Sequence, residues 1–417
     1  MLENISQVID GPPGTGKTFV QHYLIKETLS KGGRVLYLLL TAQLASRMRE
    51  KFGNSIDIDT FHAALGDGDG RDGPPNSAAL ASYSLVLIDE CYHLTEKLFN
   101  HFNAVWIACG RVPAAVLAGD RHQMGAPGGT PAYLMPLWKK AVFSTTLRVS
   151  AEFKQRCNDP EQSRFLQVLR MNKPSPRGGR GLTVPQLVRG RKAWNGVEPT
   201  VDDIKRLFHK HPDTTILTVS RAGATKIDEL CMRAKYPRRE PLVILPGDME
   251  SNPANYYSSM PKKGQLKPSQ DLKARQVPIH KGMPLYLTKN VRKDVDFVNG
   301  MLARVEDYDH KSGGLRVLTN TGHRVTVWKW TDKELGNRTY YPIRPGFAST
   351  IIKFQGAELR HVTIYLDIPG IPGAAYTAIS RVATVSQWLI GGKVGPEHFT
   401  PRREAFMRRF TQRRIRY

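Results

Sequence analysis

The sequence predicts an α/β fold with parallel sheets in two domains and a small β insertion in the second. Residues 35–40 and 85–88 are apolar at nearly every position, so neither face of these strands is expected to meet water. A helical pattern at residues 19–29 follows the first strand, as a parallel crossover requires. The chain of 417 residues exceeds the size of one core and suits two or three domains.

A glycine-rich loop follows the first strand, which ends near Ile9. The loop fits the pattern G-x-x-x-x-G-K-[S/T] and occupies Gly11, Pro12, Pro13, Gly14, Thr15, Gly16, Lys17 and Thr18. Its glycines allow backbone N–H groups to surround a polyphosphate at the positive end of the following helix. In this pattern Lys17 contacts the β- and γ-phosphates and the Thr18 hydroxyl ligates Mg²⁺, which makes ATP and Mg²⁺ the predicted cofactors. A simple Gly/Pro turn is the alternative.

Polar side chains follow the next two strands, at the edge of the sheet where α/β proteins bind ligands. Thr41 ends the first of these strands, and Thr60, Phe61 and His62 end the second. Hydroxyl, aromatic and imidazole groups together suit contacts with a nucleic-acid backbone and base. A helix cap at Thr41 and a buried ring at Phe61 are the structural alternatives.

Two carboxylates, Asp89 and Glu90, end the strand at residues 85–88. Asp89 is predicted to hold Mg²⁺, and Glu90 to polarise the water that attacks the γ-phosphate. A further strand at residues 114–118 is followed by Gln123, whose amide can donate to the γ-phosphate and accept from a nucleic-acid contact. For each segment taken alone, a polar turn after a strand is the alternative.

The charge balance favours a polyanionic partner. Sixty-one Lys and Arg against 37 Asp and Glu give a net charge of +24, and nucleic acid is the expected partner. The sequence has no apolar run of membrane-spanning length and no secretory leader, so no membrane partner is expected. The cysteines form no C-x-x-C pair, which favours an intracellular, reducing compartment and leaves the nucleus or a viral replication site open.

The second half repeats the strand and helix patterns. Residues 214–220 and 242–245 are predicted to be buried strands of a second parallel sheet, joined by a helix at residues 222–234. An earlier helix is expected at residues 160–170. Residues 252–281 are polar and punctuated by proline, which indicates a long surface excursion.

The strand-end motifs, in this order, resemble those of superfamily 1 helicases. Residues 146–148 and 376–381 are similar to two later motifs of that family. The resemblance implies two RecA-like P-loop NTPase domains with the nucleotide between them. It also implies that Arg148 and Arg381 reach the γ-phosphate, where an arginine stabilises transition-state charge.

Residues 348–356 resemble a further helicase motif. The residues retained from it are Thr350, Lys353, Gln355 and Gly356. The resemblance implies that the first two hold the nucleic-acid backbone and that the last two contact the nucleotide. Ile352 and Phe354 depart from the family, which usually has histidine and serine there.

A third resemblance concerns direction. Thr288-Lys289-Asn290 and Asn299-Gly300 are similar to the RecD-like and PIF-type branch, which travels 5′ to 3′ and carries an inserted SH3-like β-barrel. Three alternating segments within residues 302–330 match such a barrel. Trp328 and Trp330 are expected in its core, with base stacking as the alternative. The expected division is a first RecA-like domain at 1–150, a second at 151–300 and 341–417, and the barrel at 301–340.

The sequence therefore predicts an ATP-dependent helicase on single-stranded or tailed nucleic acid, with DNA favoured and 5′-to-3′ movement. One alternative is an RNA helicase of a positive-strand RNA virus, against which the Thr-Lys-Asn segment weighs. Another is a nucleic-acid-binding module with a decayed ATPase, against which intact Lys17, Glu90 and Arg381 weigh. The arginine-rich residues 401–417 suit phosphate binding, a nuclear address or a solvated helix. Replication or repair partners are not identified.

Overall fold

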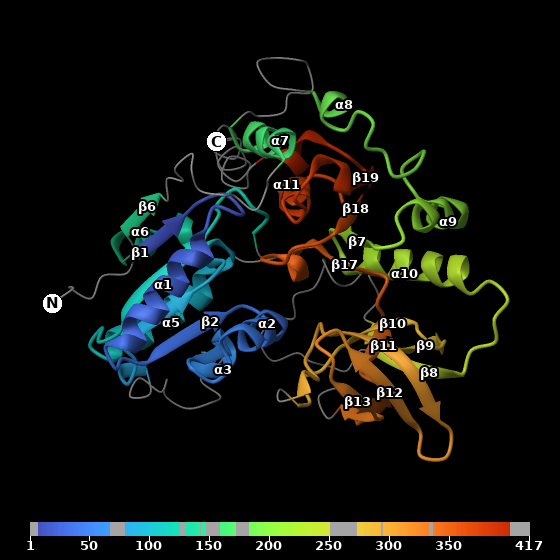
Figure 1. Cartoon of the computed structure of the whole chain (residues 1–417), viewed down its shortest axis with the longest axis horizontal. Coiled ribbons are helices and arrows are strands. Elements are labelled where there is room, and N and C mark those ends of the chain that lie inside the picture. Colours follow the sequence, from blue (N-terminus) through green and yellow to red (C-terminus); the bar gives the residue numbers. More distant parts are fainter. Residues whose placement is uncertain are drawn as a thin grey trace, which may run out of the picture. The chain divides into compact units, whose positions relative to one another are not determined.

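A computed structural model of the chain describes residues 7–66, 80–125, 130–141, 143–146, 159–171, 183–250, 273–292, 295–332 and 337–400 (Figure 1). The chain divides into two compact units, which we describe separately. The first comprises Met1–Pro199, Lys210–Val219 and Thr350–Tyr417, and the second comprises Thr200–His209 and Ser220–Ser349. The domain boundaries expected at residues 150, 300 and 340 stay predictions, because compactness alone does not delimit RecA-like domains.

The first unit begins with a six-stranded parallel sheet in the order β3-β2-β4-β5-β1-β6, which confirms the parallel strands expected here. Its strands are β1 (Gln7–Asp10), β2 (Val35–Leu39), β3 (Asp57–Thr60), β4 (Leu85–Ile88), β5 (Ala114–Gly119) and β6 (Phe143–Thr146). The connecting helices are α1 (Lys17–Ser30), α2 (Ala42–Phe52), α3 (Phe61–Leu65), η1 (Cys91–His93), α5 (Glu96–Ala108), η2 (Ala132–Leu134) and α6 (Pro136–Ala141). Parallel strands end at one edge, so the polar residues that follow them are brought together.

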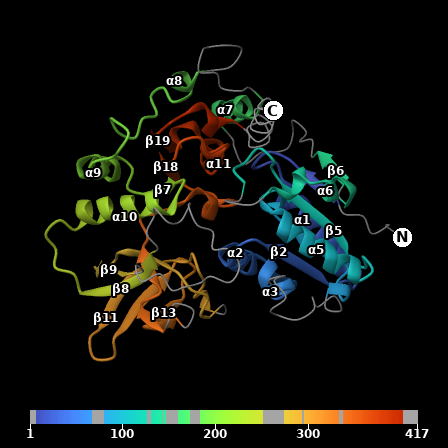
Figure 2. The same ribbon diagram turned by 180° about the vertical axis from the view of Figure 1, so that it is seen from behind.

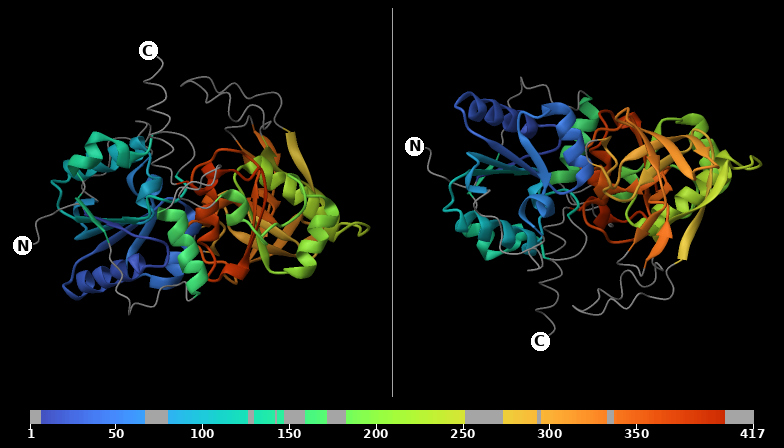
Figure 3. Two further views of the ribbon diagram at one scale, coloured as in Figure 1. Left: turned by 90° about the horizontal axis from the view of Figure 1, so that it is seen from above. Right: turned by 90° about the horizontal axis from the view of Figure 1, so that it is seen from below.

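Side chains of each strand alternate between two cores, one on each face of this sheet. In β2, Leu36 and Leu38 pack with Phe99 of α5, whereas Tyr37 packs with Ile25 of α1. Figure 3 shows α1, in blue, on one face of the sheet and the blue-green helices on the other. Both faces are buried, which explains why the strand is apolar throughout. Each such side chain contributes on the order of 2 kcal/mol by its burial.

A second parallel sheet of the first unit contains β7 (Thr214–Thr218), β18 (His361–Leu366) and β19 (Trp388–Gly392). The helices around it include the expected helix at 160–170; they are α7 (Pro160–Met171), α8 (Val184–Leu187), η5 (Ile351–Phe354), α11 (Ala374–Ile379), η6 (Val385–Gln387) and η7 (Pro396–Phe399). Gln162 of α7 links two of these elements, because its amide donates to Ile379 O at 3.1 Å and accepts from the Trp388 indole at 3.3 Å.

The second unit contains helices α9 (Val201–Lys210) and α10 (Arg221–Lys235) and an antiparallel sheet in the order β13-β12-β11-β10-β16 (Figure 2). That sheet is made of β10 (Pro284–Leu287), β11 (Leu302–Asp309), β12 (Gly314–Thr319), β13 (Arg324–Val327) and β16 (Ile343–Pro345). Two hairpins join β8 (Val243–Glu250) with β9 (Lys273–Ile279) and β14 (Trp330–Asp332) with β15 (Arg338–Tyr340). The chain returns to the first unit through β17 (Ala348–Thr350). The three expected strands are present as β11, β12 and β13, whereas barrel closure stays a prediction.

Two expectations for the second unit were wrong. Residues 242–245 were expected in a parallel sheet, but β8 pairs antiparallel with β9, which occupies part of the expected polar excursion. An apolar run can belong to a parallel or an antiparallel sheet, and its residues do not show which one when the partner strand has been interpreted as a surface loop. Trp328 was expected to be buried but is 52% exposed. Strand β13 ends one residue earlier and Trp330 begins another strand, so the two rings do not share one strand face.

Candidate nucleotide and nucleic-acid site

The glycine-rich loop lies between the end of β1 and the start of α1. Gly14 and Gly16 have positive φ angles of 75° and 86°, which only glycine adopts readily. Gly16 is also the N-cap of α1, so the loop turns directly into the helix. Gly11 N donates to Gly119 O at 3.1 Å, which fixes the loop to the end of β5. The expected strand–loop–helix context is therefore present.

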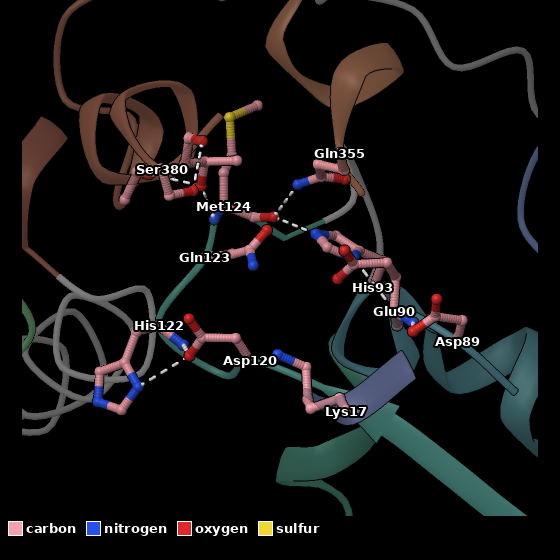
Figure 4. Close-up of polar contacts among 12 residues, drawn as sticks. Lys17, Asp89, Glu90, His93, Asp120, His122, Gln123, Met124, Gln355 and Ser380 are labelled. Carbon is pink, nitrogen blue, oxygen red and sulfur yellow. Dashed lines mark hydrogen bonds and ion pairs between the residues drawn. The ribbon is translucent and has the colours of Figure 1, made fainter. Parts of the chain in front are cut away.

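Lys17 lies on the inner side of this loop. Its ammonium donates to Gly11 O at 2.7 Å and to Pro12 O at 2.8 Å. The side chain of Thr15 also bonds within the loop, because its hydroxyl donates to Pro12 O at 2.8 Å. Figure 4 shows Lys17 in the same region as Asp89, Glu90 and Asp120, which come from the ends of other strands. One cation thus stands among three carboxylates.

Asp89 shares a hydrogen-bond network with α1. Its Oδ1 accepts from Glu90 N at 2.9 Å, and its Oδ2 lies 3.3 Å from the Tyr37 hydroxyl, which also reaches Gln21 Oε1 at 2.9 Å. Burial and the neighbouring Glu90 charge raise the pKa of Asp89 to about 6, although Lys17 opposes the shift. A divalent cation would relieve this crowding of negative charge.

The donor set suits Mg²⁺. The carboxylate of Asp89 and the hydroxyl of Thr18 are oxygen ligands, which Mg²⁺ prefers, and Mg²⁺ is usually held by one or two protein groups plus phosphate oxygens. Across the described ranges, no group of three or more His, Cys, Asp and Glu could hold a metal by itself. A metal at this position would therefore depend on a bound nucleotide for its remaining ligands.

Glu90 has an unusual backbone. Its φ angle of 50° lies in the left-handed region, which costs a non-glycine residue energy. Its carboxylate Oε2 is 3.8 Å from His93 Nδ1. A Cβ built on Gly356 would lie 3.7 Å from Glu90 Oε1 and 3.6 Å from Leu44 Cδ2, so η5 ends close to the expected general base.

The loop after β5 joins the two sheets of the first unit. Asp120 Oδ2 accepts from the Tyr376 hydroxyl at 2.8 Å, and Met124 N donates to Thr377 Oγ1 at 2.6 Å. Gly373 precedes both of these partners and has no room for a side chain, because a Cβ there would lie 2.9 Å from His122 O. Helix α11 therefore sits directly against this loop.

Arg381 and Gln123 are brought together at the same place. Arg381 is 1% exposed; its Nη2 donates to Gln123 Oε1 at 3.4 Å and to Ser380 Oγ at 2.8 Å, and its Nε donates to Thr377 O at 3.0 Å. Gln355 also reaches this loop, since its Nε2 donates to Met124 O at 2.8 Å. The loop after β5 therefore contains Gln123 and is contacted by two other expected site residues from distant segments, Gln355 and Arg381.

The expected nucleic-acid contacts have mixed surroundings. Thr41 and Thr60 cap helices, because their hydroxyls accept from Leu44 N and Ala63 N, both at 3.3 Å. Phe61 is 3% exposed and packs in the core beside Phe102, in agreement with the structural alternative. Thr350 is the N-cap of η5 and Lys353 lies within that turn, and both residues are partly exposed. Arg148, the His62 side chain and the tail at 401–417 lie outside the described residues.

Sequence reasoning missed two polar groups in this region. His93 is 4% exposed and contacts both Glu90 and Met124. Asp10 is fully buried at the end of β1, and its Oδ2 lies 2.9 Å from Arg121 Nε, which pairs the carboxylate with the loop after β5. The only signal for His93 was its place three residues after Glu90.

Comparisons with known proteins address the fold. An AAA domain family profile matches residues 2–177. Bacteroides Pif1 bound to ssDNA is 18% identical, with a TM-score of 0.63, over 99% of this chain and 94% of that one. Bacteroides Pif1 with ADP-AlF3 and ssDNA is 17% identical, with a TM-score of 0.65, over 98% and 94% of the two chains.

Pif1 helicase from Candida albicans is 17% identical, with a TM-score of 0.62, over 99% of this chain and 96% of that one. The chain has the fold of the Pif1 helicases. The predicted class, two RecA-like α/β domains with parallel sheets, is thus confirmed. No curated protein matches the sequence significantly. Within the part of this chain that the structure describes, no helix is long and apolar enough to cross a membrane.

Proposed function

We propose that this chain is an ATP-dependent helicase that moves 5′ to 3′ on single-stranded DNA. The observation that carries the proposal is the meeting of Gln123, Gln355 and Arg381 at the loop after β5, beside Lys17 and Glu90. A nucleotide at the loop would thus be sensed by segments from both parallel sheets. The Pif1 structures of this fold that bind ssDNA support DNA as the partner.

The proposed ATP site uses residues 11–18 for the phosphates, with Gln355 and Gly356 approaching from the second sheet. Lys17 exchanges its two carbonyl contacts for phosphate oxygens. Thr18 and Asp89 hold Mg²⁺, which when bound neutralises phosphate charge. The oxygen donors and the crowded carboxylates described above fit that ion.

Hydrolysis is assigned to three polar side chains. Glu90 orients the attacking water and accepts its proton. Gln123 and Arg381 stabilise charge that develops on the γ-phosphate, where preorganised donors lower the barrier. Their mutual contact at 3.4 Å supports this shared assignment. Arg148 is assigned a second arginine contact by resemblance alone.

Strand binding is assigned to Thr41, Thr60, Thr350 and Lys353. The net charge of +24 supports binding to a polyanion, and phosphate contacts supply most of the affinity for a single strand. Cys91, Cys109 and Cys231 are free thiols, which suits a reducing compartment. Because Gln355 follows Lys353 by two residues and bonds Met124, strand contact and nucleotide contact share one short segment.

The test compares ATP turnover without nucleic acid, with single-stranded DNA and with single-stranded RNA of the same sequence. We expect DNA to stimulate turnover most. The Lys17→Ala variant is the control, and it is expected to lose turnover in all three conditions while retaining strand affinity. A turnover rate indifferent to nucleic acid would reject the proposed function, and stronger stimulation by RNA would reject DNA as the substrate.

A further inference from the structure

His93 lies between the expected general base and the loop after β5. Its ring is almost fully buried, with 4% of the residue exposed. Nδ1 lies 3.1 Å from Glu90 O, and Nε2 forms a short hydrogen bond with Met124 O. Figure 4 shows the ring pointing from η1 toward Met124, beside Gln355. The imidazole thus connects the backbones of two segments that follow different strands.

Met124 is held from three sides. Its carbonyl accepts from His93 Nε2 and from Gln355 Nε2 at 2.8 Å, whereas its amide donates to Thr377 Oγ1 at 2.6 Å. The Thr377 hydroxyl donates in turn to Gly373 O at 2.8 Å. His93 comes from the first sheet, and the other two partners come from segments around the second. The Met124 peptide is therefore the point at which these contacts converge.

The choice of histidine at this position is informative. A buried polar ring is costly unless it is hydrogen-bonded, and a leucine or phenylalanine would fill a similar volume without that cost. Histidine has two ring nitrogens on different edges, so one side chain can lie against two carbonyls at once; it donates to one of them as the neutral ring and to both only as the protonated imidazolium. It also braces Glu90, whose left-handed backbone must be held by its surroundings.

We propose that His93 is a positioning residue that transmits movement of the Met124 loop to Glu90. The inference rests on the proposed function, because it names how strand binding would reach the general base. When segments around the second sheet shift on a bound strand, Gln355 and Thr377 displace the Met124 peptide. His93 moves with the Met124 peptide and shifts the Glu90 carbonyl. That shift changes the orientation of the Glu90 carboxylate.

The test is the His93→Phe variant, which keeps an aromatic ring and removes both nitrogens. We expect the DNA-stimulated kcat to fall about tenfold, the order expected from one lost buried hydrogen bond. The KM for ATP and the affinity for the strand are expected to stay at wild-type values, because the ring touches neither. Turnover without DNA should fall less, so that the stimulation ratio drops.

His101→Phe is the matched control. His101 is a partly buried histidine of α5 whose Nε2 contacts Leu65 O at 2.8 Å, away from the Met124 loop. It should lose stability to a similar degree, measured by thermal unfolding, and keep the wild-type stimulation ratio. If wild type is stimulated and His93→Phe is stimulated equally, the proposal is overturned while the helicase assignment stands. An unstimulated wild type would overturn both.

A second variant separates transmission from local damage. Thr377→Val keeps the side-chain shape and removes the acceptor of Met124 N. If both residues act in series through Met124, each single variant lowers the stimulation ratio, and the double variant is no worse than the poorer single one. Losses that multiply in the double variant would mean independent effects and would contradict transmission through Met124.

Discussion

The guanidinium of Arg381 lies 3.4 Å from the amide oxygen of Gln123, although 258 positions separate them in the chain. Arg381 is also held by Thr377 O and Ser380 Oγ, so the guanidinium is oriented before any ligand binds. A preorganised donor costs little reorganisation when charge develops beside it. The contact explains how two motifs so distant in sequence can act on one ligand.

Replacing Arg381 by lysine should separate charge from geometry. Lysine keeps the positive charge but lacks the planar guanidinium with its separate N–H donors. Its single ammonium therefore cannot bond to Thr377, Ser380 and Gln123 together. We expect DNA-stimulated turnover to fall by about 10³-fold, as for loss of an arginine finger, with ATP binding retained. Turnover is measured at saturating ATP and DNA, and ATP affinity by equilibrium titration. Wild-type turnover in this variant would remove Arg381 from the proposed mechanism.

Glu90→Gln should bind ATP and DNA but hydrolyse slowly. The amide has nearly the shape of the carboxylate but cannot accept the proton of the attacking water, so the expected loss is about 10²- to 10⁴-fold. Glu50→Gln is a suitable control, because Glu50 lies on the exposed surface of α2. A single-turnover measurement isolates the chemical step. Normal hydrolysis would place the general base elsewhere.

Parts of this site follow from side-chain patterns, and others do not. Gly14, Gly16 and Lys17 were identified because the loop imposes particular residues at fixed spacing. His93 was missed because one of its partners, Met124 O, is a backbone atom that no side-chain pattern specifies. Phe61 was placed at the strand contact because an aromatic ring can stack on a base or fill a core, and its sequence neighbours do not distinguish the two.

The fold shows the same limit. Strand β2 was predicted to be parallel because both of its faces are apolar, and two cores account for that pattern. Strand β8 was assigned to the wrong kind of sheet because its partner, β9, contains lysine, arginine and glutamine and was interpreted as a surface segment. Pairing between distant segments depends on the partner strand, which a local pattern does not reveal.

The raised pKa of Asp89 predicts a pH-dependent stability. Its pKa is about 6 in the folded chain and 3.8 in the unfolded reference, so between these values the folded state binds more protons. The contribution of Asp89 to the free energy of unfolding therefore falls as pH rises from about 4 to about 6. An asparagine side chain cannot ionise, so the Asp89→Asn variant should gain stability relative to wild type over this range.

Urea unfolding of both proteins at pH 4 and at pH 7, without Mg²⁺ or nucleotide, measures this difference. Asp228 also has a raised pKa, but it is present in both proteins and cancels in the comparison. Added Mg²⁺ and nucleotide should reduce the gap at pH 7, because a cation beside the carboxylate favours its charged form. A stability difference that does not change with pH would contradict the buried, crowded setting of Asp89.

The proposed direction of movement is the boldest prediction. The residues that suggested it are bonded within the second unit: Lys289 pairs with Asp332 at 2.8 Å, and Asn290 Oδ1 accepts from Asn299 N at 2.8 Å. These side chains therefore bond to other residues of that unit, and their resemblance to the 5′-to-3′ branch does not require a direct contact with the strand. Direction itself depends on which domain holds the strand when nucleotide is bound, a property of the whole fold.

We expect unwinding of a duplex with a 5′ single-stranded tail and little unwinding of the same duplex with a 3′ tail. A blunt duplex and the Lys17→Ala variant serve as controls in a fluorescence strand-separation assay. Efficient unwinding from the 3′ tail would reject the 5′-to-3′ assignment and leave the ATPase assignment intact.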